Sequence, residues 1–229
     1  MNIIINGGTR GIGRDVAFLL ACDPGNKILV TGRNESALDS LRTMKDNILT
    51  FRMDLSEFDT YAESFRKYVL ENLSNVDILI NMAGTLISEK FDIISDKDAR
   101  MMMDVNFFGT AFIIRLIKPF MNKGSHIVNI SSMGGFQGSV KFGGLSFYSA
   151  SKAALANLSE CLAVEYSDSG INVNCLALGA VQTEMLEEAF PGYQAPVSSE
   201  EMSRYIADFA LHGSKYFNGK VIPVAVNNP

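Results

Sequence analysis

Several residue types that mark whole classes of protein are scarce in this sequence. Its 229 residues include no tryptophan, only three cysteines and only two histidines. Cys22, Cys161 and Cys175 are odd in number and far apart, which excludes a disulfide framework and favours ordinary buried thiols in a reducing compartment. His126 and His212 are too few for a histidine-based metal centre, so we expect no metal.

Long apolar runs and a strong excess of one charge are missing as well. No apolar stretch reaches the ~18 residues that a membrane span needs. The formal net charge is −5, which argues against the clustered lysine and arginine of a nucleic-acid-binding protein. The first predicted strand starts at residue 2 with no signal peptide before it. We therefore expect a cytoplasmic protein that binds neither nucleic acid nor membrane.

Short β-branched runs alternate with amphipathic segments along the chain. Continuous β-branched runs are typical of strands covered on both faces, and apolar residues three and four apart predict helices. This order predicts an α/β fold, a Rossmann-type doubly wound parallel sheet of about seven strands with helices on both faces, in one domain over residues 1–229. Strands are predicted at residues 2–6, 27–31, 48–53, 76–81, 126–130, 171–176 and 221–226, and helices at 11–22, 36–44, 56–72, 96–122 and 149–169.

Residues 182–199 break this alternation. Pro191, Gly192 and Pro196 interrupt the segment, and apolar side chains are scattered through it. Because it follows the sixth predicted strand, it should emerge at the carboxyl edge of the sheet, where ligands bind in such folds. We expect a mobile substrate loop at about residues 182–199.

The first predicted strand runs through a glycine-rich turn directly into a helix. Glycine lets the backbone turn tightly and approach a pyrophosphate, and the amides at the start of the helix then face the phosphates. In this strand–turn–helix context the turn predicts dinucleotide binding, with a tight turn that holds no ligand as the alternative. The residues expected at the cofactor here are Gly7, Thr9, Arg10, Gly11, Ile12 and Gly13.

The second predicted strand ends without the acidic residue that binds the adenosine ribose in NAD enzymes. Gly32 stands at that position, Arg33 follows it, and Arg10 lies in the glycine-rich turn. A hydrogen bond to a charged group is worth ~1.5–3 kcal/mol, roughly a ten- to hundredfold preference, so two guanidiniums favour the 2′-phosphate of NADP(H). The alternative is that both arginines are solvated surface charges.

Tyr148 and Lys152 stand four residues apart at the start of a predicted helix, so they share one face. A free phenol has a pKa near ~10, and a neighbouring ammonium favours the phenolate. Ser132 ends the preceding strand at the same sheet edge, where its hydroxyl can hold a carbonyl oxygen; simple strand termination is the alternative. Asn106 is a polar residue within an apolar helix, and its alternative is a buried amide paired with backbone.

Three motifs of this sequence resemble those of the short-chain dehydrogenase/reductase family, and the resemblance covers nearly the whole chain. They are G-x-x-x-G-x-G at residues 7–13, Asn81-Met82-Ala83-Gly84, and Tyr148-x-x-x-Lys152. The resemblance implies that Tyr148 moves the proton, Ser132 holds the carbonyl oxygen, Lys152 lowers the pKa of the phenol, and Asn106 holds a water, while NADP(H) carries the hydride. It implies further cofactor contacts from Asp54, Leu55, Asn81, Ala83, Gly84, Tyr148, Lys152, Gly179, Val181 and Thr183.

The chain departs from the family pattern in two places. Leu178 stands where the family usually has proline, which predicts a less rigid loop. Ser132 and Tyr148 are about three residues further apart than usual, and we expect the additional residues in 141–146, bulging outward. An apolar substrate pocket is expected from Phe136, Phe142, Phe147, Met185 and Tyr193.

The sequence therefore predicts an NADP(H)-dependent oxidoreductase that moves a hydride between nicotinamide and a carbonyl or secondary alcohol. By resemblance we expect a homodimer or homotetramer, joined through the helices that start near Asp96 and Ser149. Two alternatives use the same scaffold. One is a non-catalytic NADP-sensing or regulatory protein, and the other is an epimerase or dehydratase that holds its cofactor tightly.

Overall fold

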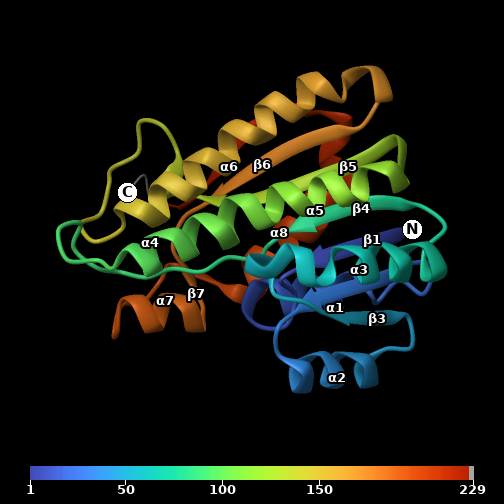
Figure 1. Ribbon diagram of the computed structural model, residues 1–229, viewed down its shortest axis with the longest axis horizontal. Helices are drawn as coiled ribbons and strands as arrows, with labels where there is room; N and C mark the ends of the chain where they lie inside the picture. Colours follow the sequence, from blue (N-terminus) through green and yellow to red (C-terminus); the bar gives the residue numbers. More distant parts are fainter. Residues whose placement is uncertain (227–229) are drawn as a thin grey trace.

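The computed structural model describes residues 1–226; residues 227–229, the end of the predicted domain, lie outside them. Seven parallel strands form one sheet in the order β3-β2-β1-β4-β5-β6-β9 (Figure 1), which confirms the predicted fold class. The strands are β1 (Asn2–Asn6), β2 (Lys27–Gly32), β3 (Ile48–Arg52), β4 (Val76–Asn81), β5 (Met121–Ser132), β6 (Asn172–Leu178) and β9 (Val221–Val224). The helices beside the sheet are α1 (Gly11–Leu20), α2 (Glu35–Met44), α3 (Phe58–Asn72), α4 (Asp96–Met103), α5 (Thr110–Ile117), α6 (Ser146–Glu165) and α8 (Ser199–His212).

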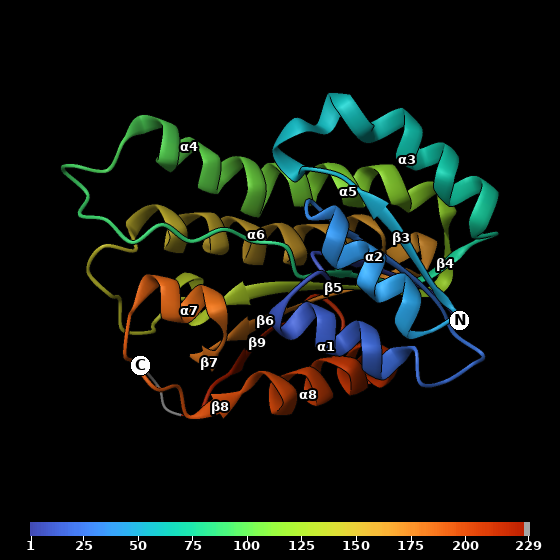
Figure 2. The ribbon, with the colours of Figure 1, turned by 90° about the horizontal axis from the view of Figure 1, so that it is seen from below.

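The alternating side chains of the strands build two separate cores. Ile3 and Ile5 of β1 pack with α1, α2 and α8, whereas Ile4 packs with α3, α5 and α6. Figure 2 shows the sheet between these layers, with α1 and α8 on the opposite side from α3, α5 and α6. Because the strand order reverses between β1 and β4, the carboxyl ends of these two strands flank the crevice where ligands bind in such sheets.

The predicted helix 96–122 is wrong in its length and continuity. After α4 the chain makes a π-helical turn, Asp104–Gly109, continues as α5 to Ile117, and then forms a 3₁₀ turn that contains Pro119. Proline removes a backbone donor and ends the helix there. The following residues extend into β5, which starts at Met121 and pairs that residue with Val76 of β4, rather than at 126.

The segment after β6 holds more regular structure than the sequence predicts. Residues 182–199 include part of the short pair β7 (Val181–Gln182) and β8 (Val197–Ser198), and helix α7 (Glu184–Ala189) lies between those strands. Helix α8 was not predicted at all, although it begins with a capping box in which Ser198 accepts from Glu201 N. The mobility of residues 182–199 stays a prediction.

The three cysteines differ in burial. Cys175 is buried in β6, as expected, but Cys22 and Cys161 are exposed, so the expectation of buried thiols is wrong for these two. All three are free thiols. Within residues 1–226, no helix has both the length and the apolar character that crossing a bilayer requires.

A row of buried polar side chains crosses the sheet at a single register position. Thr31 of β2, Asn6 of β1, Asn81 of β4 and Asn129 of β5 are direct neighbours in the strand pairing. Thr31 Oγ1 donates to Asn6 Oδ1 (3.0 Å), Asn6 Nδ2 to Asn81 Oδ1 (3.4 Å), and Asn81 Nδ2 to Asn129 Oδ1 (2.8 Å). Asn129 Nδ2 then donates to Ser159 Oγ of α6 at 2.9 Å. We call these five residues the amide ladder.

Replacing the central member of the amide ladder should destabilise the protein. In an Asn81→Ala variant, Asn6 Nδ2 and Asn129 Oδ1 lose their shared partner while they remain buried. An unsatisfied buried group costs ~1–3 kcal/mol, so we expect the free energy of unfolding in urea to fall by about 2–4 kcal/mol. Asn157→Ala, on the exposed side of α6, is the control and should change it by less than ~0.5 kcal/mol. Equal small losses in both variants would contradict the ladder's role.

Candidate active site

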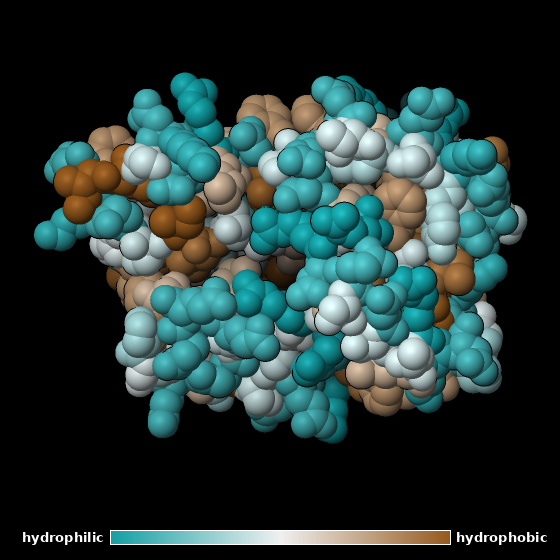
Figure 3. Space-filling model, turned by 60° about the horizontal axis from the view of Figure 1, so that its bottom comes forward, coloured by the Kyte–Doolittle hydropathy of each residue, from teal (hydrophilic) through white to brown (hydrophobic). Residues whose placement is uncertain are grey.

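The structure brings most of the predicted site residues to one cavity of about 570 Å³ at the carboxyl edge of the sheet. On the face shown in Figure 3 the surface is hollowed, and apolar side chains lie in the depth of the hollow between hydrophilic rims. Of the predicted catalytic and cofactor-binding residues, only Asn81 and Asn106 are not part of its wall. Those on the wall are Gly7, Thr9, Arg10, Gly11, Ile12, Gly13, Arg33, Asp54, Leu55, Ala83, Gly84, Ser132, Tyr148, Lys152, Gly179, Val181 and Thr183.

The glycine-rich turn between β1 and α1 has no room for side chains at two positions. Gly7 has a φ of 87°, and a Cβ there would lie 2.4 Å from the backbone of Ala83. A Cβ on Gly13 would lie 2.3 Å from Gly7 O. No side chain caps α1, so the amides of its first turn remain available to an anion in the cavity. The turn has the shape and the donors that a pyrophosphate requires.

The two arginines expected at the ribose do not face the cavity as free cations. Arg10 Nη1 pairs with Glu184 (3.2 Å) and Glu188 (3.0 Å), both on α7. Arg33 Nη1 lies 3.6 Å from Asp54 Oδ2. Both arginines carry acidic partners, so the expected free guanidiniums are not found, whereas their exposure of 51% and 67% agrees with the alternative of solvated surface charges. Exposed ion pairs contribute only ~0–1 kcal/mol, so a phosphate can compete for both arginines.

Asp54 follows β3 and caps the short 3₁₀ turn Leu55–Glu57. Its Oδ1 accepts from Ser56 N (3.0 Å) and from Ser56 Oγ (2.8 Å). Partial burial acts to raise the pKa of Asp54, but the hydrogen bonds from Ser56 and the charge of Arg33 outweigh it and lower the pKa. The carboxylate is therefore charged at neutral pH. Asp54 thus acts as a helix N-cap through Oδ1, while Oδ2 lies beside Arg33.

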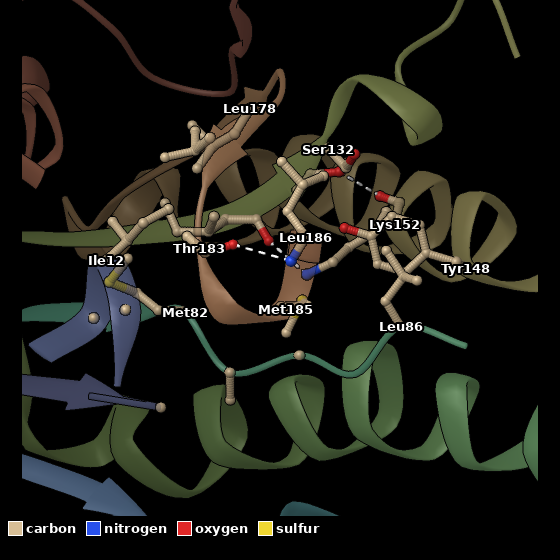
Figure 4. A pocket seen from close by; sticks show the side chains of 18 of the residues that line it. Ile12, Met82, Leu86, Ser132, Tyr148, Lys152, Leu178, Thr183, Met185 and Leu186 are labelled. Carbon is tan, nitrogen blue, oxygen red and sulfur yellow. Dashed lines mark hydrogen bonds between the residues drawn. The ribbon is translucent and has the colours of Figure 1, made fainter. Parts of the chain in front are cut away.

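Ser132, at the end of β5, and Tyr148, in the first turn of α6, meet inside the cavity (Figure 4). Ser132 Oγ accepts from Gly134 N at 3.1 Å, which orients the hydroxyl group. Burial raises the pKa of the Tyr148 phenol, and a hydrogen bond with Ser132 opposes that shift. The neighbouring Ser131 is committed elsewhere, because its Oγ donates to Lys152 O at 2.8 Å. Ser132 is thus the serine that has a hydroxyl group free for a substrate.

Lys152 lies one turn beyond Tyr148 on α6 and is almost completely buried, at 4% exposure. Its Nζ donates to Ile130 O at 2.9 Å. Burial lowers the pKa of Lys152 to about 8, although the nearby Cys175 thiol acts in the opposite direction. Burial dominates the Tyr148 phenol and raises its pKa, and the lowering of that pKa by Lys152 stays a prediction.

The side chains of Asn106 and Asn81 form hydrogen bonds within the protein interior. Asn106 is fully buried in the π-helical turn. Its Nδ2 donates to Thr85 O and to Ser151 Oγ (both 2.9 Å), and its Oδ1 accepts from Thr85 N at 2.7 Å. Pairing with backbone was the alternative reading for this residue. A Cβ on Gly84 would lie 3.3 Å from Asn106 Oδ1 and 3.2 Å from Lys152 Nζ, so these two polar atoms flank the same small gap. Asn81 belongs to the amide ladder.

Apolar side chains form the rest of the cavity wall. Phe142, Met185 and Tyr193 lie there as expected, but Phe136 and Phe147 do not. Phe147 instead stacks on Phe91, with ring centroids 5.6 Å apart. Leu186, Phe190 and Pro196 also lie on the wall and belong to the predicted substrate loop at residues 182–199. The sequence prediction missed Leu86, Met133, Leu145 and Val226. Hydrophobicity alone does not distinguish such residues from the core, so the sequence carried no signal for them.

The additional residues between Ser132 and Tyr148 do not simply bulge outward. The loop that holds them folds against the segment after β4, where Glu89 N donates to Gly144 O at 3.0 Å. This contact brings Phe142 and Leu145 onto the cavity wall. Most residues of 141–146 are exposed, as expected of an outward bulge, but the longer loop also builds part of the pocket.

Comparisons with known sequences identify relatives of this chain. The family model described as short chain dehydrogenase matches residues 1–194. The chain is 30% identical over 228 residues to an uncharacterized oxidoreductase of Staphylococcus saprophyticus, which covers 96% of this chain and 95% of that protein.

Solved structures of similar shape cover almost the whole chain. A dehydrogenase/reductase from Sinorhizobium meliloti superimposes with a TM-score of 0.84 at 27% identity, covering 97% of this chain and 92% of that one. A short chain dehydrogenase from Burkholderia cenocepacia in complex with NADP has a TM-score of 0.84 at 22% identity, covering 97% and 95%. At this lower identity the second likeness shows the fold alone.

The buried ammonium of Lys152 should cost stability. A pKa displaced from 10.5 to about 8 corresponds to roughly 3 kcal/mol, so Lys152→Met should raise the free energy of unfolding at pH 7 by up to about 3 kcal/mol. Between pH 8 and 10.5 the unfolded chain holds a proton that the native chain lacks, so the stability of the wild type rises with pH and the difference shrinks. Urea titrations from pH 7 to 10 measure both effects.

The exposed Lys67, which pairs with Glu71 on α3, provides the matched control. Lys67→Met should change the free energy of unfolding by less than ~0.5 kcal/mol at every pH. If Lys152→Met destabilised the protein at pH 7, the ammonium would be stabilised by its surroundings and the argument from burial would be wrong.

Proposed function

The chain belongs to the short-chain dehydrogenase/reductase family of oxidoreductases, and we propose that it reduces a carbonyl group with NADPH or oxidises the corresponding secondary alcohol with NADP⁺. One observation carries the proposal. The Ser132 hydroxyl and the Tyr148 phenol interact in the same cavity that the glycine-rich turn enters. A proton donor and an oxygen-holding group thus share one space with a phosphate cradle.

The residues around the cavity fit a dinucleotide. The glycine-rich turn and the free amides of α1 suit the pyrophosphate, and Arg10 and Arg33 suit a 2′-phosphate. Asp54 would accept from the adenine amino group, and Gly179, Val181 and Thr183 would contact the nicotinamide carboxamide. When bound, the cofactor supplies the hydride.

In the reducing direction Ser132 Oγ donates to the carbonyl oxygen of the substrate, and Tyr148 gives that oxygen its proton as negative charge develops. The raised pKa of Tyr148 keeps the phenol protonated at neutral pH. The site is therefore prepared to donate a proton, which favours reduction. Oxidation requires the phenolate and should need a higher pH.

Lys152 would bind the nicotinamide ribose and provide a route for protons. Its Nζ faces the gap beside Gly84, and Asn106 Oδ1 faces the same gap from the other side. A water in this gap can accept from Lys152 and donate to Asn106, which would extend the proton path away from Tyr148. This assigns to Asn106 the water-holding role that the family resemblance implies.

NADP rather than NAD is supported by two cations at the adenosine end of the cavity, Arg10 and Arg33. The Burkholderia cenocepacia neighbour holds NADP in a fold of the same shape. Two exposed free thiols fit a reducing compartment, so we place the protein in the cytoplasm. We also propose a homodimer or homotetramer through α4, α5 and α6, where the Phe108 ring is 43% exposed.

Loss of the phenolic hydroxyl should abolish turnover without abolishing cofactor binding. We expect Tyr148→Phe to lower kcat for NADPH-dependent carbonyl reduction by about 10²–10⁴-fold, because the proton donor is removed. Tyr166→Phe, at the far end of α6, should retain full activity. A panel of ketones and aldehydes assayed by NADPH absorbance, together with NADPH titrations by fluorescence, measures both properties.

The same assays separate the enzyme from a sensor. A non-catalytic NADP-sensing protein would bind NADPH but would not oxidise it with any carbonyl compound in the panel. The Tyr148→Phe substitution would then leave both properties unchanged. Equal activity of wild type and Tyr148→Phe on any carbonyl would remove Tyr148 from the mechanism.

Arg33 should select the phosphorylated cofactor. Removing a charged hydrogen-bond donor costs ~1.5–3 kcal/mol, so Arg33→Ala should lower kcat/KM for NADPH roughly ten- to hundredfold. NADH has no 2′-phosphate, so kcat/KM for NADH in the same variant should change less than about threefold. Parallel losses with both cofactors would contradict a specific role at the phosphate.

A further inference from the structure

We propose that the substrates are uncharged carbonyl compounds that carry an apolar ring, a substrate class that rests on the proposed function and deepens it. The inference comes from the part of the cavity wall around Ser132 and Tyr148. In Figure 4 the side chains of Leu86, Met185 and Leu186 are drawn in the same pocket as these two polar groups.

Two segments contribute rings and thioethers to this wall. The long loop before α6 provides Phe142, and the segment that includes α7 provides Met185, Phe190 and Tyr193. Aromatic rings prefer offset or edge-on contacts with other rings, and methionine sulfur also packs well against them. A flat apolar group on the substrate fits this lining better than a hydroxylated or charged one.

The charged residues on the wall, among residues 1–226, already have partners. Arg10 pairs with Glu184, and Arg33 lies beside Asp54. Lys152 is the remaining charged residue of the described wall, and its Nζ donates to Ile130 O.

Lys141 directly precedes Phe142 in the sequence but is not part of the wall. Its Nζ donates to Phe136 O (2.6 Å) and to Ser139 Oγ (2.7 Å). Under the proposed function the 2′-phosphate of the cofactor takes Arg10 and Arg33, and the ribose takes Lys152. No cation of the described wall is then left to neutralise an anionic substrate beside Phe142 and Met185.

Helix α7 explains how an apolar wall is held next to a charged cofactor end. Its Glu184 and Glu188 pair with Arg10, while Met185 and Leu186, between them in sequence, line the cavity. The helix is fixed by its acidic side and presents its apolar side to the substrate. A carboxylate or phosphate placed against that side would lose its hydration and gain no counterion.

Three para-substituted acetophenones test the inference, because they share the ketone and the ring. They are 4-methylacetophenone, methyl 4-acetylbenzoate and 4-acetylbenzoate, of which only the last is charged. With saturating NADPH we expect kcat/KM for both neutral ketones to exceed that for 4-acetylbenzoate at least 100-fold. We expect 2-butanone, which has no ring, to be at least tenfold poorer than 4-methylacetophenone.

A charge placed in the wall should reverse part of this preference. Met185→Lys keeps an unbranched chain of similar length and adds an ammonium, so it should shift the ratio at least tenfold toward 4-acetylbenzoate. Met185→Leu is the matched control, and it should leave the ratio unchanged within about threefold. A preference for 4-acetylbenzoate in the wild type, or equal ratios in all three proteins, overturns the inference.

Failure of the proposed function gives a different result. If no carbonyl compound supports NADPH oxidation, the reductase proposal fails. Saturation-transfer NMR on the NADPH complex then tests ligand binding in the pocket independently of turnover. Binding of methyl 4-acetylbenzoate without binding of 4-acetylbenzoate supports the uncharged class. Binding of the acid, or of neither compound, overturns it.

Discussion

The amide ladder is the constraint on which the site geometry depends. It joins β2, β1, β4 and β5 at one register and ends on Ser159 of α6. Every member donates in the same direction, toward α6, so the bonds polarise one another. Asn129 lies directly before Ile130 and Ser131, the two residues that bond to Lys152. A displacement of α6 would break the last bond of the ladder and move Tyr148 and Lys152 with it.

At the carboxyl edge of the sheet, two buried polar side chains reduce the stability of the fold. Lys152 is held in an apolar interior with one carbonyl acceptor, and the Tyr148 phenol has a raised pKa because of burial. Neither group stabilises the fold by being there. Functional sites commonly carry such costs, and here the two apolar cores on either side of the sheet offset them. The ladder keeps the costly side chains aligned, because its own polar groups are all paired.

The sequence predicted what local spacing determines. The glycine-rich turn, most strands of the main sheet and the Tyr148–Lys152 pair each depend on neighbouring residues, and the structure has them close to where they were expected, apart from the earlier start of β5. The partners of Arg10 were not predictable, because they lie 174 and 178 residues away on a helix that the sequence reading took for a loop. The ladder did leave a signal, since Asn6 and Asn81 each end a β-branched run. Recognising it required knowing which strands are neighbours.

Helix α7 links the two ends of the cavity in a way that neither end reveals alone. The carboxylates that hold Arg10 belong to the same short helix as Met185 and Leu186. A phosphate bound by Arg10 competes with those carboxylates, because one guanidinium cannot satisfy both sets of acceptors fully. Under the proposed function, a cofactor phosphate at Arg10 would therefore weaken the contact that holds α7, the helix that carries part of the apolar wall.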